Sequence, residues 1–318
     1  MSEVVSLGSS NVDRIQYLPA ERIRELENRH GWFPAAGETV RIDGVTDGTV
    51  LEGRSYRNVV GGKGANQAVA AARASAETSL LGCVGADEAE YGVLETLSER
   101  GVDVDRVAIT DRETGKAYVF VDDDGESWIA IVGGANDAVD EAYLDRQYDR
   151  IRTADVLLLQ NEIPRATMDR LLGRLEREAI RPTVVFNPAP VGGAAPLLDR
   201  SAIDFVVVNE TEYRALEDRL AAVDGTVVRT RGGDDVIVTG SVTHRATPPT
   251  VDPVDTTGAG DAFCGYFGAA LADGAAVEHA VDVATVAASI ATEREGAQSA
   301  IPPAERVFGV LEGGASSF

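Results

Sequence analysis

Short apolar runs alternate with amphipathic segments along most of the chain. The apolar runs predict strands at 4–7, 78–81, 156–159, 183–186, 205–208, 227–230 and 236–239. Helices are expected between several of them, at 65–73, 87–100, 166–178 and 210–221. Because continuous apolar strands alternate with helices, we predict a doubly wound, mostly parallel α/β sheet with helices on both faces. Ligands of such sheets bind at the carboxyl ends of the strands.

Two segments, about 14–60 and 112–133, follow a different pattern. Runs at 116–121 and 127–132 flank a turn of three aspartates and a glycine, which predicts a β-hairpin. The first segment contains a short charged helix at 19–30 and exposed strands at 39–42 and 49–51. We expect both segments to form a small β-sheet lid, inserted in a single domain that spans 1–318.

The charge of the chain excludes several classes of function. Its 318 residues carry 29 basic and 52 acidic side chains, a net charge of −23, and 44% of the residues are hydrophobic. This hydrophobic content is typical of a folded domain, while the negative charge argues against binding nucleic acid or anionic membranes. No apolar run approaches the length of a membrane span. The expected partners are therefore small molecules.

Cysteine and lysine are both scarce. Cys83 and Cys264 are too few for a disulfide framework, and the N-terminus has no secretion-signal pattern, so we expect a cytoplasmic protein. Lys63 and Lys116 are the only lysines, and the other 27 basic residues are arginines. Codon bias would also favour arginine, but it does not account for 52 carboxylates. We therefore favour adaptation to high salt, which screens self-repulsion.

The string Asp255 to Phe263 (DTTGAGDAF) carries the strongest chemical signal. Gly258, Ala259 and Gly260 form a small-residue turn ahead of a helix, whose first turn offers backbone N–H groups to an anion. Such a turn suits phosphate oxygens that gain charge during transfer. Asp261 stands beside these donors, where a carboxylate could take a proton from an attacking hydroxyl. Taken alone, Asp261 would more often only charge a helix N-terminus.

A second glycine-rich string, Gly61 to Gln67 (GGKGANQ), leads into an alanine-rich helix. It is not a Walker A loop, because Gly64 follows Lys63 where Ser or Thr would be required. It also lacks the glycine spacing of a dinucleotide fingerprint. By itself, the string could be a plain strand-to-helix turn.

Together the two strings resemble the signatures of the ribokinase-like (PfkB) carbohydrate kinase family. Residues 61–71 match the first signature and 255–265 match the second. Further matches follow in order at 8–13, 187–190, 209–212 and 296–298. The resemblance covers nearly the whole chain, and within the family it is nearest to the ribokinases.

The resemblance implies transfer of the γ-phosphate of ATP to the primary hydroxyl of a sugar. Asp261 would be the catalytic base, and Gly258, Ala259 and Gly260 would donate backbone N–H groups to the γ-phosphate. The residues that would hold the sugar hydroxyls are Asn11, Asp13, Gly62, Lys63, Asn66 and Glu162.

The same resemblance implies the contacts of the nucleotide and the cations. Asn209, Thr230, Gly232 and Thr285 would bind the nucleotide, and Glu212 would bind Mg²⁺ through water. A candidate K⁺ site comprises Asp255, Thr257, Ala291, Arg294 and Gly296. The expected cofactor is thus Mg²⁺, with ATP as co-substrate and K⁺ as a candidate activator.

The most plausible acceptor is O5 of ribose, or of ribose-1-phosphate, which would give ribose 1,5-bisphosphate. The predicted lid is longer than that of a ribokinase, and Lys116 lies on its hairpin, where sugar-phosphate kinases of the family place a basic residue. Lys116 is therefore a candidate ligand for a substrate phosphate, although strand alternation would turn it away from Ala117. Further basic candidates are Arg14, Arg54 and Arg57.

Other functions remain open at this point. Fructose-phosphate and nucleoside kinases belong to the same family. A non-catalytic sugar or nucleotide sensor could use the same scaffold, but a sensor would not need Asp261. Trp32 and Trp128 fall in the lid, where packing is expected, and we predict a homodimer formed through the lid.

Overall fold

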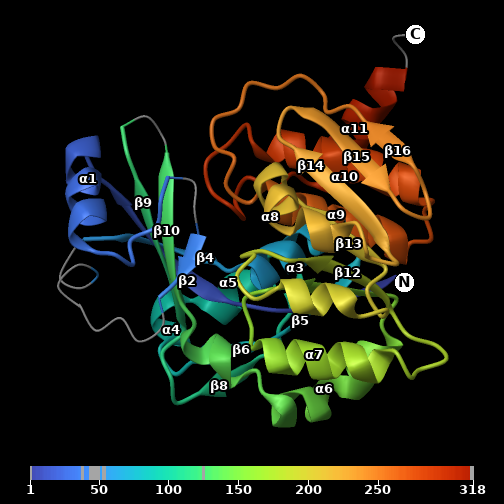
Figure 1. Ribbon diagram of the computed structural model, residues 1–318, viewed down its shortest axis with the longest axis horizontal. Coiled ribbons are helices and arrows are strands. Elements are labelled where there is room, and N and C mark those ends of the chain that lie inside the picture. Colours follow the sequence, from blue (N-terminus) through green and yellow to red (C-terminus); the bar gives the residue numbers. More distant parts are fainter. Residues whose placement is uncertain (1, 37–38, 43–50, 52–54, 124–125, 316–318) are drawn as a thin grey trace.

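The computed structural model describes residues 2–36, 39–42, 51, 55–123 and 126–315, and its largest element is a nine-stranded sheet (Figure 1). The strands are β1 (Glu3–Leu7), β5 (Glu77–Leu81), β7 (Val102–Asp103), β11 (Val156–Gln160), β12 (Thr183–Asn187), β13 (Phe205–Val208), β14 (Thr226–Arg231), β15 (Asp234–Thr239) and β16 (His244–Ala246). Their order is β16-β15-β14-β13-β12-β11-β1-β5-β7. All neighbouring pairs from β14 to β7 are parallel, whereas β15 and β16 pair in antiparallel fashion at one edge. The predicted doubly wound sheet is confirmed.

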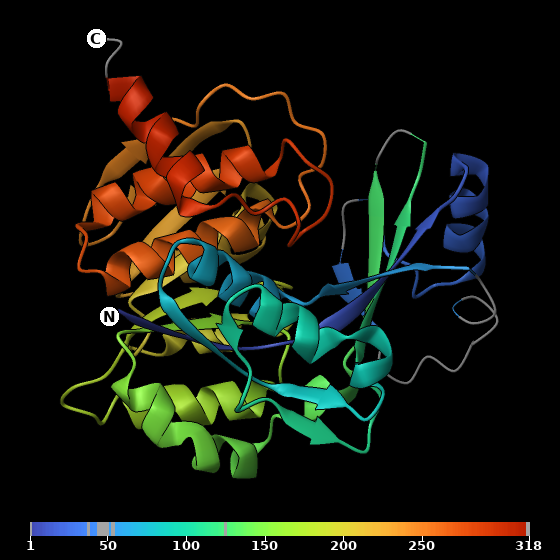
Figure 2. The ribbon, with the colours of Figure 1, turned by 180° about the vertical axis from the view of Figure 1, so that it is seen from behind.

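Helices cover both faces of this sheet (Figure 2). One face packs against α3 (Lys63–Arg73), α5 (Val93–Glu99), α9 (Ala259–Ala272), α10 (Val277–Ala291) and α11 (Ala304–Ala315). The other packs against α6 (Glu141–Thr153), α7 (Arg165–Leu175) and α8 (Glu210–Leu220). The helix expected at 87–100 is split into α4 (Glu88–Tyr91) and α5, because Gly92 adopts a left-handed φ of 64°. Within the described ranges, no helix is long and apolar enough to cross a membrane.

A second, five-stranded sheet stands to one side of the main sheet (Figure 1). Its strands, in spatial order, are β3 (Thr39–Arg41), β10 (Ser127–Val132), β9 (Gly115–Val121), β2 (Asn11–Tyr17) and β4 (Arg57–Gly61). They correspond to the two segments predicted to form a lid, but the sheet already begins at Asn11. The strand expected at 49–51 lies outside the described residues apart from Leu51. A separate pair, β6 (Cys83–Gly85) and β8 (Ala108–Thr110), lies at the base of the domain.

The outer face of the second sheet is covered by α1 (Ala20–Arg29) of the same chain (Figure 1). Ile23 and Leu26 of this helix share an apolar cluster with aromatic side chains of β9 and β10. Trp128 is buried in that cluster and donates its indole N–H to Glu27 at 2.9 Å. A homodimer through the lid stays a prediction, and it would have to use a surface other than the one that α1 covers.

Small residues allow α3 and α9 to approach each other closely. A Cβ added at Gly265 would lie 2.3 Å from the Cβ of Ala70 and 2.5 Å from the carbonyl oxygen of Gln67. Real Cβ atoms do not come so close, so the contact requires glycine at this position. The alanine-rich sequence of α3 therefore positions two helix N-termini side by side at the carboxyl ends of β1 and β11.

Replacing Gly265 with Ala tests this contact. Because backbone atoms lie where the new methyl group would be, we expect the free energy of unfolding to fall by about 1–3 kcal/mol. The matched control is Gly309→Ala in α11, where an added Cβ meets nothing within 4 Å. The control should be neutral or stabilising by up to about 1 kcal/mol. Urea unfolding measures both, and equal stability of the two variants would contradict the prediction.

Candidate active site

The turn between β1 and β2 packs against the start of α3. Gly62, which precedes the helix, has a φ of 92°, and a Cβ there would lie 2.8 Å from the backbone nitrogen of Asn11. At Gly64 a Cβ would lie 2.6 Å from the carbonyl carbon of Gly8. The glycines of the first motif are thus required by packing, and they bring Asn11 and Lys63 to the same edge of the main sheet.

The second glycine-rich motif forms the turn that begins α9. Gly258 has a φ of 78°, and a Cβ there would lie 2.7 Å from the Cα of Ala297. In contrast, a Cβ at Gly260 would meet nothing within 4 Å, and Gly260 lines two adjoining cavities. The backbone at Gly260 is therefore open to a ligand, as expected for an anion-binding helix N-terminus.

Asp261 lies at the meeting point of the two motifs. Its side chain is 5% exposed. Oδ2 accepts a hydrogen bond from Nδ2 of Asn66 at 2.9 Å, and Oδ1 accepts one from Nε2 of Gln67 at 3.0 Å. Each carboxylate oxygen can accept a further hydrogen bond, so Asp261 is oriented without being blocked.

Four titratable side chains interact electrostatically with Asp261, namely Asp13, Lys63, Glu162 and Glu212. Burial raises the pKa of Asp13 to about 7, and the neighbouring Glu162 and Asp261 carboxylates contribute, while Lys63 opposes the shift. Burial also raises the pKa of Glu162, which accepts hydrogen bonds from the Ser9 hydroxyl and the backbone N–H of Lys63. Burial alone would lower the pKa of Lys63, but the carboxylates of Asp261, Glu162 and Glu212 raise it above its ordinary value. Lys63 therefore carries a positive charge at neutral pH.

A polar cavity of about 140 Å³ opens beside Asp261 and Lys63. Its other polar lining residues are Asn187, Asn209, Glu212 and Thr230, with Gly258 and Gly260 from the second motif. Carboxylate and amide oxygens are ligands that suit Mg²⁺, directly or through water, so the donor set fits the predicted cation. Burial raises the pKa of Glu212, although the backbone N–H of Asn209 opposes the shift.

A larger, mostly apolar cavity of about 400 Å³ adjoins the polar one. Thr230 and Gly260 line both, and the predicted nucleotide contacts Gly232 and Thr285 line the larger cavity. Its remaining wall includes Val236, Pro248, Pro249, Val251, Pro253, Phe263 and Ala288. Apolar walls beside a polar cavity suit a planar base joined to phosphates.

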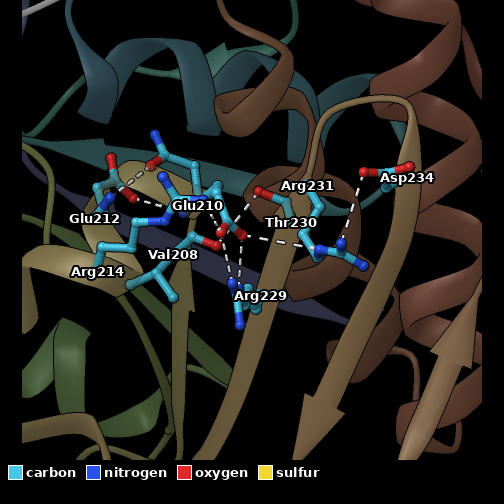
Figure 3. A network of polar contacts seen from close by, with 9 residues as sticks. Val208, Glu210, Glu212, Arg214, Arg229, Thr230, Arg231 and Asp234 are labelled. Atoms are coloured by element: carbon cyan, nitrogen blue, oxygen red, sulfur yellow. Dashed lines mark hydrogen bonds and ion pairs between the residues drawn. The ribbon is translucent and has the colours of Figure 1, made fainter. Parts of the chain in front are cut away.

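The wall between β14 and α8 is held by ion pairs around Glu210 (Figure 3). Arg229 donates two hydrogen bonds to Glu210, at 2.8 and 2.6 Å, and lowers the pKa of that carboxyl. Arg214 approaches within 2.9 Å and Arg231 within 3.8 Å of the same carboxylate. This network ties the end of β14, which carries Thr230, to the start of α8.

Asn209 and Glu212 also have a structural role at the start of α8. The Asn209 side chain accepts the backbone N–H of Glu212 at 2.8 Å, and Glu212 accepts the backbone N–H of Asn209 at 2.9 Å. This capping box fixes both side chains at the rim of the polar cavity. Their positions are thus set before any ligand binds.

Two of the candidate K⁺ residues, Thr257 and Gly296, contact a third, Asp255. Its carboxylate accepts the backbone N–H groups of Thr257 and Gly296, each at 2.8 Å, and its backbone N–H binds the carbonyl oxygen of Thr292. Asp255 therefore joins the loop before α9 to the loop after α10, which includes Arg294 and follows Ala291. Activation by K⁺ stays a prediction.

Lys116 lies on the opposite face of β9 from the one that carries Ala117, and its role as a substrate ligand stays a prediction. In β9 it pairs with Val12 of β2, whereas Ala117 pairs with Asp13, so Lys116 faces away from Asp13. Its ammonium binds Glu113 at 2.5 Å. Arg14 faces the same way as Lys116, and its guanidinium lies 5.9 and 5.7 Å from the ring centroids of Tyr56 and Tyr118.

Arg57 is placed differently from Lys116. In β4 it pairs with Ile15, so it shares the face of Asp13, and its guanidinium lies 3.8 Å from the Glu295 carboxylate of the main domain. Both side chains of this ion pair are exposed. Arg54, the remaining basic candidate, lies outside the described residues.

Several polar residues of the site were not assigned a role from the sequence. Asn136 donates to Oδ1 of Asn11 at 2.7 Å and is buried, and Asn187 lines the polar cavity. Gln67 and Gln298 contact Asp261 and Asn66. The family resemblance could have pointed to three of these residues, since the matched strings include Gln67, Asn187 and Gln298. No motif in the sequence pointed to Asn136.

Comparison with known proteins agrees with this geometry. The model of the pfkB family carbohydrate kinases matches residues 33–304. The chain belongs to this family. It is therefore a sugar kinase, a phosphotransferase with an alcohol group as acceptor, and its relatives include ribokinases.

Three of these relatives bear on the site. Ribokinase of Bacillus subtilis is 34% identical, over 87% of this chain and 92% of its own. The ATP-dependent ribose-1-phosphate kinase of Halopiger xanaduensis is 36% identical, over 81% and 88%. The structure of Arabidopsis thaliana ribokinase complexed with ribose and ATP has a TM-score of 0.75 and 27% identity, with 98% of both chains covered.

The raised pKa of Asp13 predicts a pH-dependent effect of Asp13→Asn. The folded state holds a proton on Asp13 up to about pH 7, whereas the unfolded chain releases it near the ordinary pKa of 3.8. The wild type therefore loses stability as the pH rises through this window, and the asparagine variant does not. The variant's advantage in unfolding free energy should grow across the window and level off above it. Urea unfolding below, within and above the window measures this advantage, and a pH-independent difference would contradict it.

Proposed function

We propose that this chain is an ATP-dependent, Mg²⁺-requiring kinase that phosphorylates O5 of a ribofuranose. The observation that carries the proposal is the position of Asp261, in the first turn of α9, at the wall of the polar cavity and beside the half-buried Lys63. A base, an anion-binding helix start and a fixed positive charge thus surround one small space. The solved relative complexed with ribose and ATP supports the same pair of ligands.

The proposed mechanism depends on position and charge. Asp261 takes the proton of the attacking hydroxyl, while the backbone N–H groups from Gly258 to Gly260 bind the phosphoryl oxygens. Lys63 offsets the negative charge of the sugar-side carboxylates and the phosphates. Bound Mg²⁺ would neutralise phosphate oxygens from the side of Glu212 and Asn187. The second sheet acts as a lid that excludes water from the cleft.

For the acceptor we favour ribose-1-phosphate over free ribose. One relative is named as a ribose-1-phosphate kinase, and Arg57 lies on the face of the lid that carries Asp13. A guanidinium there could bind a C1 phosphate by charge-assisted hydrogen bonds. Free ribose is the second candidate, favoured by the relatives named ribokinase.

Asp261→Asn tests the proposed base. We expect kcat to fall about 10²–10⁴-fold, because the amide cannot accept the proton, with the KM for ATP nearly unchanged. Asp273→Asn, at the exposed end of the same helix, is the matched control and should keep wild-type activity. The rate of ADP release from ATP gives kcat and KM for both variants. Unaltered turnover of the Asp261 variant would refute its role as base.

The acceptor is tested by offering ribose and ribose-1-phosphate side by side in molar KCl. We expect kcat/KM to be at least about tenfold higher for ribose-1-phosphate, the worth of one charged hydrogen bond. Arg57→Gln should remove this advantage and leave the value for ribose unchanged. A preference for ribose would contradict the phosphorylated substrate. If neither ribose nor ribose-1-phosphate is phosphorylated, fructose phosphates and nucleosides are the next acceptors to assay.

A further inference from the structure

We infer that Arg100, at the end of α5, is a positioning residue for Asp261, acting through Gln298 and Asn66. The inference rests on the proposed function, because it takes Asp261 to be the catalytic base. It adds a polar chain that begins outside the cavities and ends on the reacting group. Neither Arg100 nor Gln298 lines either cavity of the site.

Hydrogen bonds connect these four side chains in series. The Arg100 guanidinium donates to Oε1 of Gln298. Nε2 of Gln298 donates to Oδ1 of Asn66 at 2.8 Å, and Nδ2 of Asn66 donates to Oδ2 of Asp261 at 2.9 Å. Gln298, Asn66 and Asp261 are each at most 5% exposed, so water does not compete for these bonds.

The two ends of the chain fix its direction. An arginine can only donate hydrogen bonds and an ionised carboxylate can only accept them. With Arg100 at one end, Gln298 must present its oxygen to Arg100 and its NH₂ group to Asn66. Asn66 must then turn its own NH₂ group toward Asp261. Without a donor at the Arg100 position, the Oε1 atom of Gln298 loses its partner, and the Asp261 carboxylate alone then fixes the orientation of both amides.

A second chain holds the other carboxylate oxygen. Nε2 of Gln160 donates to Oε1 of Gln67 at 2.6 Å, and Gln67 donates to Oδ1 of Asp261. The Oε1 atom of Gln160 is buried without a hydrogen-bond partner in the described part of the chain. Because the NH₂ group of Gln160 faces Gln67, the Gln160 oxygen stays unpaired, and Gln67 is held in the orientation in which it donates to Asp261. The carboxylate plane is held from two sides, and only the first chain begins at a charged group.

The inference is tested with Arg100→Met, Arg100→Lys and a control, Arg73→Met. Burial lowers the pKa of Arg100, and the like charge of the nearby Arg73 lowers it further. Among the described contacts, Gln298 accepts its hydrogen bond from Arg100 and not from Arg73. For Arg100→Met we expect kcat to fall about tenfold through misorientation of the base, with the KM for ATP unchanged.

Arg100→Lys keeps a donor-only group and should recover most of kcat. Arg73→Met should match the wild type in kcat and in the KM for ATP. If Arg100→Met has wild-type kcat, if its loss appears in the KM for ATP instead of kcat, or if either of the other two variants is as impaired as Arg100→Met, the inference is wrong. Should Arg100→Met fail to fold in a melting experiment, Gln298→Met interrupts the next link and must show the same fall in kcat with an unchanged KM for ATP.

This outcome is separable from that of the proposed function. If Asp261→Asn stays active, the catalytic assignment fails, whatever the Arg100 variants do. If Asp261→Asn is inactive and Arg100→Met behaves as the wild type, only the positioning role of Arg100 fails.

Discussion

The close contact between α3 and α9 is the constraint on which the site depends. Gly265 faces Ala70 and the backbone of α3 at a separation that admits no side chain. Because the two helices meet here, the first turns of both open at the same place. Asn66 and Gln67 then reach Asp261 with ordinary hydrogen-bond lengths. A larger residue in either helix would separate the base from the groups that orient it.

Charge inside the site is arranged around a single ammonium. Lys63 lies near Asp13, Glu162, Glu212 and Asp261, and the last three carboxylates raise its pKa above the ordinary value. In a chain with a net charge of −23, an anionic nucleotide meets few favourable charges outside such a site. Oriented backbone N–H groups and a divalent cation are the remaining ways to stabilise its phosphates. The polar cavity is lined by the glycines that begin α9 and by carboxylate and amide oxygens of the kind that suit such a cation.

The sequence predicted the main sheet well and the second sheet less well. Apolar runs such as 156–159 and 205–208 became central parallel strands, because burial on both faces leaves a continuous apolar signal. β2 and β4 were not predicted as such, because their residues alternate with polar side chains that belong to the site. Lys116 illustrates the limit. The sequence predicted that it lies on a hairpin strand, but the face to which its side chain points depends on the register of β9 with β2.

The sequence by itself determined the fold class, the two glycine-rich turns and the identity of the base candidate. These follow from local properties, since the hydrophobic period, the glycine spacing and the helix starts each depend on residues that are close together in the sequence. Only the tertiary structure decided which distant side chains meet. Arg100, Gln298, Asn66 and Asp261 belong to four separate segments, and Asn136 reaches Asn11 from a fifth. Their contacts arise from the packing of helices and loops around one sheet, and no local pattern encodes such distances.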